Sequence, residues 1–554
     1  MKNILLSRRA AVAAALGSGV AGATAFAVQS GTQAASSDGN LGARVYNVRD
    51  YGAKGDGKTL DTAAIQAAID ACTNDKGGTV LVPAGNFLTG AIWLKSNVTL
   101  HLAAMAHVLG STNIKDYTPP TGAPTTPWGS VLIAAVDAEN VTIEGTGTVD
   151  GQGAEYLPGA RDDGERDAGR PRPHLLIFSR CRHLTIRDVF FRNSAYHCCR
   201  ILQCGFVSLD GVRIHTRVHF NNDGFHINSC EHVKISNCNV ACEDDACALF
   251  GSNHDVTVTN CTFSTRWSVF RFGGGVSENI TVSNCVINDT FGCPIKAQIG
   301  AGSRMENMVF SNLVMNNVTG PIYLGLGSVP RNSMNPQETA KGGVVRNILF
   351  QGIRATIAAA PDLTNYPYVV GTPISDIYPG EHRTCIDLSS VAGQFLENIS
   401  FNDVHITFAG GGSAQEAALR DVPQVSGAEY FGLGVLPAYG MYARNVRGLS
   451  LSDVRFDVAT PDLRPALVFD HVEDGIVNGF SAQGNTKAES LARFIDTRDV
   501  LMAACRVLTP SAVFLKVEGA RSGGITIGGS DLSKVASPVS FSRGAAKDAV
   551  KLRE

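Results

Sequence analysis

Short blocks in which apolar and polar residues alternate recur along most of the chain, and a polar turn inside each block separates two short apolar runs. Alternation with a period of two predicts half-buried β-strands, and the blocks lack the 3.6-residue period of a helix. The six most regular blocks are HLTIRDVFF (183–191), FVSLDGVRI (206–214), HVKISNCNV (232–240), DVTVTNCTF (255–263), NITVSNCVI (279–287) and NMVFSNLVM (307–315).

These blocks return at a nearly constant interval. Equivalent positions lie 23, 26, 23, 24 and 28 residues apart when measured at Ile186, Leu209, Ile235, Val258, Val282 and Phe310. The unit recurs with longer insertions at 347–355, 398–406 and 448–456, and again through 524–532. A period of 20 to 50 residues is typical of a solenoid. Since each unit holds two short strands, we predict an all-β, right-handed parallel β-helix rather than a leucine-rich or helical repeat.

Two sets of residues share equivalent turn positions and should stack, because neighbouring coils lie about 4.8 Å apart. Asn237, Asn260, Asn284 and Asn312 predict an asparagine ladder, and Cys238, Cys261 and Cys285 predict a row of buried thiols that Leu313 continues. Such thiols act as small apolar side chains, and paired C-x-x-C zinc spacing is absent from the sequence. Among the fourteen cysteines, Cys198–Cys199 and Cys242/Cys247 make one disulfide possible but do not require it.

The segment DTAAIQAAIDAC (61–72) predicts a short amphipathic helix before the repeat. Ile65, Ile69 and Cys72 fall on one face, and Asp61 or Thr62 is the expected N-cap. A helix at this place would cover the open end of the solenoid.

The first 35 residues or so predict an export signal and not part of the fold. Arg8 and Arg9 follow Ser7, an Ala-rich and weakly apolar stretch comes next, and small residues stand at Ala25 and Ala27. This pattern is typical of a twin-arginine signal, with an ordinary secretory signal as the alternative. We expect a periplasmic or extracellular protein whose residues 36–554 form a single β-helix domain.

The charge and hydropathy of the chain exclude several classes of partner. With 47 basic and 50 acidic residues the net charge is −3, which gives no electrostatic footprint for nucleic acid. No apolar run after the signal approaches the roughly 20 residues of a membrane span. We expect a soluble monomer without a cofactor.

The candidate chemistry lies where three consecutive units depart from the apolar pattern. These stretches are NNDGFHINS (221–229), CEDDAC (242–247) and TRWSVFRFGGG (265–275). Asp223 lies 21 residues before Asp244, and Asp245 lies 21 before Arg266, so these side chains should stack on one side of the solenoid. Lys296 would occupy the next layer.

Three neighbouring carboxylates can divide the work of an acid and a base. Like charges a few ångströms apart raise one pKa and leave another group ionised, so one carboxyl donates a proton while its neighbour activates water. A structural acidic turn or a calcium site is the alternative, but Ca²⁺ needs six to eight oxygen ligands. The nearby Arg266, Arg271 and Lys296 disfavour it, and we expect no metal.

At these residues the chain resembles glycoside hydrolase family 28, the polygalacturonase family of pectin-degrading enzymes. The family signatures N-T-D, D-D, G-H-G and R-I-K correspond to NND (221–223), DD (244–245), TRWS (265–268) and PIK (294–296). The similarity covers about residues 45–327, which would form the catalytic core, with extended coils and loops over 328–554.

The resemblance implies an inverting glycosidase acting on a pectic or related acidic polysaccharide. Asp244 would be the general acid, Asp223 and Asp245 would activate the attacking water, and Lys296 would bind a uronate carboxylate. Inversion requires carboxyl groups about 6.5–9.5 Å apart.

The chain departs from the family signatures at two places. The His of G-H-G is missing, with Arg266 or Trp267 nearest its place, and Pro294 replaces the Arg of R-I-K. Arg266 or Arg271 could restore the lost cation; otherwise the substrate could be a rhamnogalacturonan-type chain. Four further candidates for substrate contact are His226, His197, Trp267 and Tyr323.

Three questions stay open at the level of sequence. A polysaccharide lyase or epimerase on the same scaffold would use Arg266, Arg271 or Lys296 to remove a proton next to a carboxylate. A non-catalytic carbohydrate-binding β-helix is a further alternative, which the intact Asp223, Asp244 and Asp245 oppose. Insertions around 328–397 and 407–445 could close one end of a cleft and favour exo action.

Overall fold

The computed structural model describes residues 44–124, 126, 129–156, 172–219, 221–327, 342–360, 384–425 and 430–553. These residues contain forty β-strands and two α-helices. The predicted export signal lies outside the described residues, as do residues 328–341, 361–383 and 426–429 of the predicted insertions around 328–397 and 407–445. No helix in the described ranges is long and apolar enough to cross a membrane.

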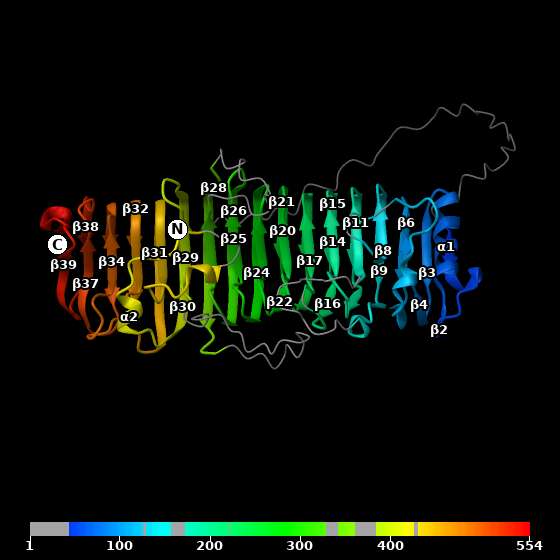
Figure 1. The fold of residues 1–554 in the computed structure, drawn as a ribbon, viewed down its shortest axis with the longest axis horizontal. Helices are drawn as coiled ribbons and strands as arrows, with labels where there is room; N and C mark the ends of the chain where they lie inside the picture. The colour runs from blue at the N-terminus through cyan, green and yellow to red at the C-terminus, as the bar shows by residue number, and fades with distance from the viewer. Residues whose placement is uncertain are drawn as a thin grey trace, which may run out of the picture. The chain divides into compact units, whose positions relative to one another are not determined.

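The strands pair in parallel with the equivalent strand of the next coil and form three columns, which confirms the predicted parallel β-helix. Figure 1 shows the coils following one another in chain order, from α1 at the blue end to β39 at the red end. The residues used to measure the repeat are direct partners in this register, because Ile186 pairs with Leu209, and Leu209 with Ile235. The pairing continues through Val258 and Val282 to Phe310.

The first column contains β1 (Val45–Asn47), β3 (Gly78–Val82), β6 (Val98–Leu102), β9 (Glu139–Gly145), β12 (Arg182–Arg187), β15 (Gly205–Asp210), β18 (Glu231–Ser236), β21 (Asn253–Thr259), β24 (Val276–Thr290), β26 (Arg304–Val318), β28 (Val344–Ile357), β30 (Leu396–Gly410), β31 (Met441–Thr460), β32 (Leu467–Asn478), β35 (Arg498–Ala503), β38 (Ile525–Gly528) and β40 (Val550–Arg553).

The second column contains β2 (Asp56–Leu60), β4 (Gly85–Thr89), β7 (Ala106–Gly110), β10 (Thr148–Asp150), β13 (Phe190–Arg192), β16 (Arg213–Thr216), β19 (Asn239–Cys242), β22 (Thr262–Thr265), the later parts of β24, β26, β28, β30 and β31, and then β33 (Ser481–Ala482) and β36 (Arg506–Val507).

The third column contains β5 (Ile92–Trp93), β8 (Val131–Val136), β11 (His174–Ser179), β14 (Cys199–Leu202), β17 (Phe225–Asn228), β20 (Cys247–Phe250), β23 (Phe270–Gly273), β25 (Ile295–Ile299), β27 (Ile322–Leu326), β29 (Ile386–Ser390), the first residues of β31 and β32, and then β34 (Ala492–Ile495), β37 (Ser511–Glu518) and β39 (Val535–Ser542).

Helix α1 (Thr62–Asn74) covers the first coils, as the sequence predicts. It buries Ile65, Ile69 and Cys72 and contacts β1 and β3. Asp61 is the N-cap residue, but its carboxylate accepts hydrogen bonds from the backbone N–H groups of Lys54 (2.7 Å) and Gly55 (2.9 Å) instead of from the helix. The acid therefore ties the preceding loop to the helix start.

The four asparagines stack at one turn position, as predicted, and this position has a backbone cause. Asn237, Asn260, Asn284 and Asn312 all adopt positive φ, between 53° and 58°. Asparagine and glycine tolerate this left-handed conformation best, and Gly352 takes the same turn position in the next coil, with φ 63°. The Nδ2 of Asn312 donates to Oδ1 of Asn284 (3.1 Å).

The cysteine row is confirmed as well. The backbone N–H of Cys238 points to Sγ of Cys261 (3.4 Å), and Cys285 continues the row one coil later. All fourteen cysteines are buried and free, so the disulfide that the sequence left open is not formed. The thiols thus fill the core of the solenoid alongside its aliphatic and aromatic side chains.

Candidate active site

The three aspartates lie in turns that join the second column to the third. Asp223 precedes β17, while Asp244 and Asp245 stand between β19 and β20. Because these residues are in turns and not in strands, the alternation of strand side chains does not force one of them into the core. Phe225 pairs with Cys247, and Gly224 N–H donates to the Asp245 carbonyl (2.9 Å), which aligns Asp223 with Asp245.

This register corrects the spacing expected from the sequence. Asp223, Asp244 and Asp245 lie in equivalent turns of successive coils, in agreement with the predicted stacking on one side of the solenoid, but the 21-residue spacing misses the direct neighbours by one and two residues. The paired strands are offset by 22 residues between β17 and β20 and by 23 between β20 and β23, instead of 21. Ser268 is therefore the neighbour of Asp245 in the next coil, and Trp267 is the neighbour of Asp244.

The carboxylates differ in exposure and in partners. Asp223 and Asp245 are buried, whereas Asp244 is partly exposed. His226 Nδ1 lies 2.6 Å from Asp223 Oδ2. Asp244 accepts from Asn221 Nδ2 at Oδ2 (3.3 Å) and from the Asp245 N–H at Oδ1 (2.9 Å). Among the described residues, Asp245 Oδ1 has no hydrogen-bond partner.

Burial and mutual repulsion set the proton affinity of two of these groups. Burial, and then the charge of Asp245, raise the pKa of Asp223 well above its ordinary value. Burial, followed by the charges of Asp223 and Asp245, raises the pKa of Asp244 well above its ordinary value, and Lys296 opposes this shift. The cluster can therefore keep a proton at a pH where an exposed aspartate has lost it.

A histidine pair flanks Asp223. His197 Nδ1 lies 3.9 Å from Asp223 Oδ2, and the rings of His197 and His226 stack with centroids 4.9 Å apart and 18° between their planes. Burial, and then His226 and His174, lower the pKa of His197 well below its ordinary value, which keeps this imidazole neutral.

His197, Asp223 and His226 also form a three-residue group close enough to hold a metal ion, with ligand atoms within 4.8 Å of one another. The near-parallel rings do not direct their nitrogen lone pairs at one point. Arg200, which pairs with His226 in the neighbouring strand, adds a positive charge. The arrangement therefore fits a hydrogen-bonded carboxylate better than a metal ligand set.

Arg200, Arg271 and Lys296 lie in one row on the outward face of the third column. We call it the Lys296 row, and its members are direct strand partners in successive coils: Arg200, His226, Ala248, Arg271, Lys296, Tyr323, Asp387 and Tyr442. Arg271 and Lys296 are adjacent and fully buried. Lys296 Nζ lies 4.4 Å from the ring centroid of Trp267, which is partly exposed.

The other predicted cation has a different place. Arg266 Nη1 donates to the Phe291 carbonyl (2.9 Å), and its guanidinium lies 5.7 Å from the Trp267 ring. In the coil register Arg266 is the neighbour of Glu243, which is buried. Arg271, and not Arg266, is thus the cation that shares a row with Lys296.

The sequence reasoning missed two residues of this region. Asn222 is fully buried; its Oδ1 accepts from the N–H groups of Val218 (3.0 Å) and His219 (2.8 Å), and its Nδ2 donates to the Ser194 carbonyl (2.9 Å). This amide fixes the turn that carries Asp223. Arg200 opposes the rise in the pKa of Asp223. It lies in the apolar strand β14, so its place beside His226 follows only from the strand register.

Comparison with known proteins decides the family. The model of "Glycosyl hydrolases family 28" matches residues 72–365. The chain belongs to this family. It is therefore a glycosidase, and the predicted resemblance is confirmed. The match ends before β29, so the later coils lie beyond it.

Individual relatives are distant. Polygalacturonase-2 of Solanum lycopersicum is 26% identical over 343 residues, which is 59% of this chain and 73% of the relative. Exo-poly-alpha-D-galacturonosidase of Dickeya chrysanthemi is 27% identical, over 50% of this chain and 56% of the relative. The exopolygalacturonase structure from Thermotoga maritima aligns with 75% of this chain and 92% of its own, at 20% identity and a TM-score of 0.56, and shows the common fold.

Proposed function

We propose that this family 28 enzyme hydrolyses a glycosidic bond beside an acidic sugar in pectic polysaccharide, with inversion at the anomeric carbon. One observation carries the proposal: three aspartates on two stacked turns share a site with two adjacent buried cations, Arg271 and Lys296. The names of the family relatives, polygalacturonases and exopolygalacturonases, support a pectic substrate.

The roles follow from the environment of each carboxyl group. Asp244 is partly exposed and has a raised pKa, which suits the acid that protonates the glycosidic oxygen as the bond to the anomeric carbon breaks. Asp223 and Asp245 hold a water between them and accept its proton as its oxygen attacks that carbon from the opposite face. His226 orients the Asp223 carboxylate through their 2.6 Å contact.

The same site has the groups to recognise a uronate. Lys296 provides a point charge and Arg271, one coil earlier, provides the planar guanidinium that pairs with a carboxylate. Arg271 thereby takes the place of the cation lost at Pro294. Trp267 offers a partly exposed aromatic face for a sugar ring, and Tyr323 continues the Lys296 row beside it. His197 lines the site on the side of Asp223.

The substrate also accords with the predicted export. Pectic polysaccharide is a polymer outside the cell, and residues 1–35 have the pattern of a twin-arginine signal. We infer that the enzyme works in the periplasm or outside the cell.

The test is product analysis on defined acidic oligosaccharides. Purified enzyme should release saturated sugars, and NMR at early times should show the inverted anomer. Asp244→Asn should lower kcat by about 10²–10⁴-fold. Asp255→Asn is the matched control, because Asp255 is a half-exposed residue of β21 in the first column whose positive φ asparagine accepts.

Other outcomes would reject the proposal in distinct ways. An unsaturated, ultraviolet-absorbing product would identify a lyase, and the retained anomer would exclude the water-activating pair. Binding without turnover by the wild type would indicate a carbohydrate-binding protein.

A further inference from the structure

A cavity of about 950 Å³ lies on the later coils of the solenoid. One side of it is the turn that leads from the third column back to the first, over the five coils whose third-column strands run from β29 to β37. The other side is formed by residues 420–424 of a segment that follows β30 and contains the short helix α2 (Ala414–Ala417). The aspartates stand at the opposite end of the third-column strands, in the turns that precede them. The cavity is therefore separate from the candidate active site.

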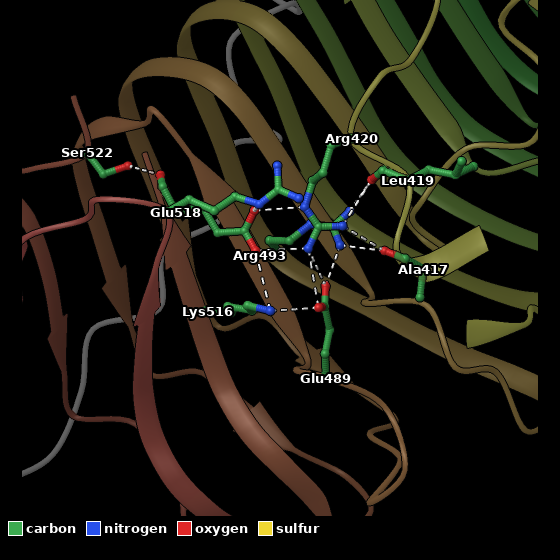
Figure 2. A network of polar contacts seen from close by, with 9 residues as sticks. Ala417, Leu419, Arg420, Glu489, Arg493, Lys516, Glu518 and Ser522 are labelled. Carbon is green, nitrogen blue, oxygen red and sulfur yellow. Dashed lines mark hydrogen bonds and ion pairs between the residues drawn. The ribbon is translucent and has the colours of Figure 1, made fainter. Parts of the chain in front are cut away.

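Two arginines hold this segment over the coils. Arg420 binds Glu518 with two hydrogen bonds, from Nε (2.8 Å) and Nη2 (2.9 Å), as Figure 2 shows. Arg444 donates to the carbonyls of Val422 and Pro423, both at 2.7 Å. Both arginines line the cavity, but most of their N–H groups are used to fix the segment. They build the wall, and the groups that bind a ligand must come from other residues.

The carboxylates that the coils contribute to the cavity already have partners. Each of the three acids is paired at both oxygens: Tyr442 and His471 for Asp470, Arg447 and Arg498 for Glu473, and the backbone and side chain of Arg521 for Asp496. The negative charge on this side of the cavity is thus balanced within the protein.

Two arginines at the rim of the cavity have N–H groups to spare. The side chains of Arg498 and Arg521 are 55% and 68% exposed. Each uses Nη2 on an acid, Arg498 at Glu473 (2.7 Å) and Arg521 at Asp496 (3.2 Å). A guanidinium carries five N–H donors, and Nε and Nη1 of both arginines make no hydrogen bond to the described residues. The rim therefore offers donors and positive charge.

Strand register explains the surplus at Arg498. This residue belongs to a row of alternating charge in the first column, in which Glu397, Arg447, Glu473 and Arg498 are successive strand partners. Arg447 lies between two acids, at 3.7 Å and 3.1 Å. The next member after Arg498 is Gly523, which brings no acid. Arg498 is thus left with one acidic partner where Arg447 has two.

The length of the cavity fits an oligosaccharide. Five coils stacked about 4.8 Å apart give it a length of about 19 Å, which is too long for an inorganic anion. Spare guanidinium groups beside paired acids select a ligand with carboxylates, because a guanidinium binds a carboxylate through two parallel hydrogen bonds. Asp421 and Gln424 of the wall are exposed and offer polar groups to sugar hydroxyls. A uronic acid oligosaccharide carries both kinds of group along its length.

We infer that this cavity is a second, non-catalytic binding site for acidic oligosaccharide, in which Arg498 and Arg521 bind uronate carboxylates and hold the polymer on the later coils. The choice of ligand rests on the proposed function, because the same acidic polymer would reach both sites. The inference assigns a role to coils that lie beyond the family match at residues 72–365.

Calorimetric titration with galacturonate oligosaccharides tests the site. The Asp244→Asn enzyme, used so that the ligand is not cleaved, should bind an oligosaccharide that spans the cavity whether or not the aspartates hold a second one. Adding Arg498→Gln and Arg521→Gln should remove this binding or weaken it about tenfold or more, because both carboxylate-binding groups are lost. Binding that survives the double substitution unchanged, or no binding event beyond that at the aspartates, would overturn the inference.

Competing ligands test the chemistry of the site. Binding should weaken as salt is added, since it depends on exposed charges. A neutral galactose oligosaccharide of the same length should not compete. Equal binding of that neutral chain would overturn the assignment to uronates, and so would displacement of the oligosaccharide by an equal concentration of inorganic phosphate.

Kinetics of the active enzyme test whether the site holds polymer. Arg498→Gln with Arg521→Gln should raise KM for polymer several-fold, because a second attachment point is lost, and should leave kcat and KM unchanged for oligosaccharides too short to reach both sites. Arg354→Gln is the control, because Arg354 makes a comparable exposed pair with Asp403 on β28. An unchanged KM for polymer would refute the holding role.

The two proposals fail in different ways. Inactivity on every acidic oligosaccharide, with binding that the double substitution removes, would reject the hydrolase and leave the cavity site. Hydrolysis without binding at the cavity would reject the site alone. Both arginines are exposed, and exposed ion pairs add little to stability, so the variants should fold. If the double variant does not fold, each single substitution should still weaken binding several-fold, and unchanged binding in both would overturn the site.

Discussion

Asp387 should make the stability of this protein depend on pH in a way that one substitution removes. It belongs to the Lys296 row on β29, is 1% exposed, and accepts a hydrogen bond from Ser389 Oγ (2.5 Å). Burial raises its pKa to about 7, against the opposing effects of this hydrogen bond and of Arg444. Asp387→Asn keeps an oxygen that can accept from Ser389 and removes the titration.

The direction of this pH dependence follows from the protons bound by the native and unfolded states. Between pH 4 and 7 the unfolded chain has lost the Asp387 proton while the native state retains it, so rising pH favours unfolding. The stabilisation is complete below the ordinary aspartate pKa of 3.8 and is lost as the pH rises to about 7. A shift of about 3 pKa units at 1.36 kcal/mol each gives a cost of about 4 kcal/mol at pH 8.

Thermal unfolding at two pH values measures this effect. An unfolding entropy of about 2 cal/mol/K per residue gives roughly 1 kcal/mol per degree for a chain of this length, so Asp387→Asn should raise Tm by about 4 °C at pH 8 and hardly at all at pH 4. Asp255→Asn should change neither value. An equal shift at both pH values, or none at pH 8, would refute a buried Asp387 with a raised pKa.

Two further predictions concern the site and the core. Lys296→Met should raise KM for acidic oligosaccharides about tenfold or more. It should also move the alkaline limb of the pH profile of kcat/KM to higher pH, because Lys296 lowers the pKa of Asp244. An unmoved limb would refute the electrostatic effect of Lys296 on Asp244. Native enzyme should react slowly with a thiol reagent, whereas all fourteen thiols should react in denaturant without reductant; fewer than fourteen would reveal a disulfide.

The fold was predictable because its signal is local and repeated. Apolar alternation identified the strands, and the residues chosen to measure the period, from Ile186 to Phe310, are direct partners in the structure. Asparagine marked the turns for a backbone reason, since the ladder position requires positive φ. Each of these rules depends on residues that are close together in the chain, so a single sequence is enough to apply it.

The candidate site was predictable in content but not in register. The motifs identified Asp223, Asp244, Asp245 and Lys296, because acids and cations are conspicuous in an apolar repeat. A spacing of 21 residues could not show that Asp223 neighbours Asp245, because turn lengths vary between coils. The sequence likewise could not decide whether Arg266 or Arg271 is the cation beside Lys296, because this depends on which side chain points outward from its strand.

The contacts of the segment 411–425, which follows β30, were beyond sequence reasoning for a different reason. Arg420 and Glu518 are 98 residues apart and belong to no repeated pattern, so nothing local links them. Their meeting follows from the solenoid itself, because every coil presents its outward residues in the same rows. An inserted segment can therefore contact several coils in succession and be fixed at each one.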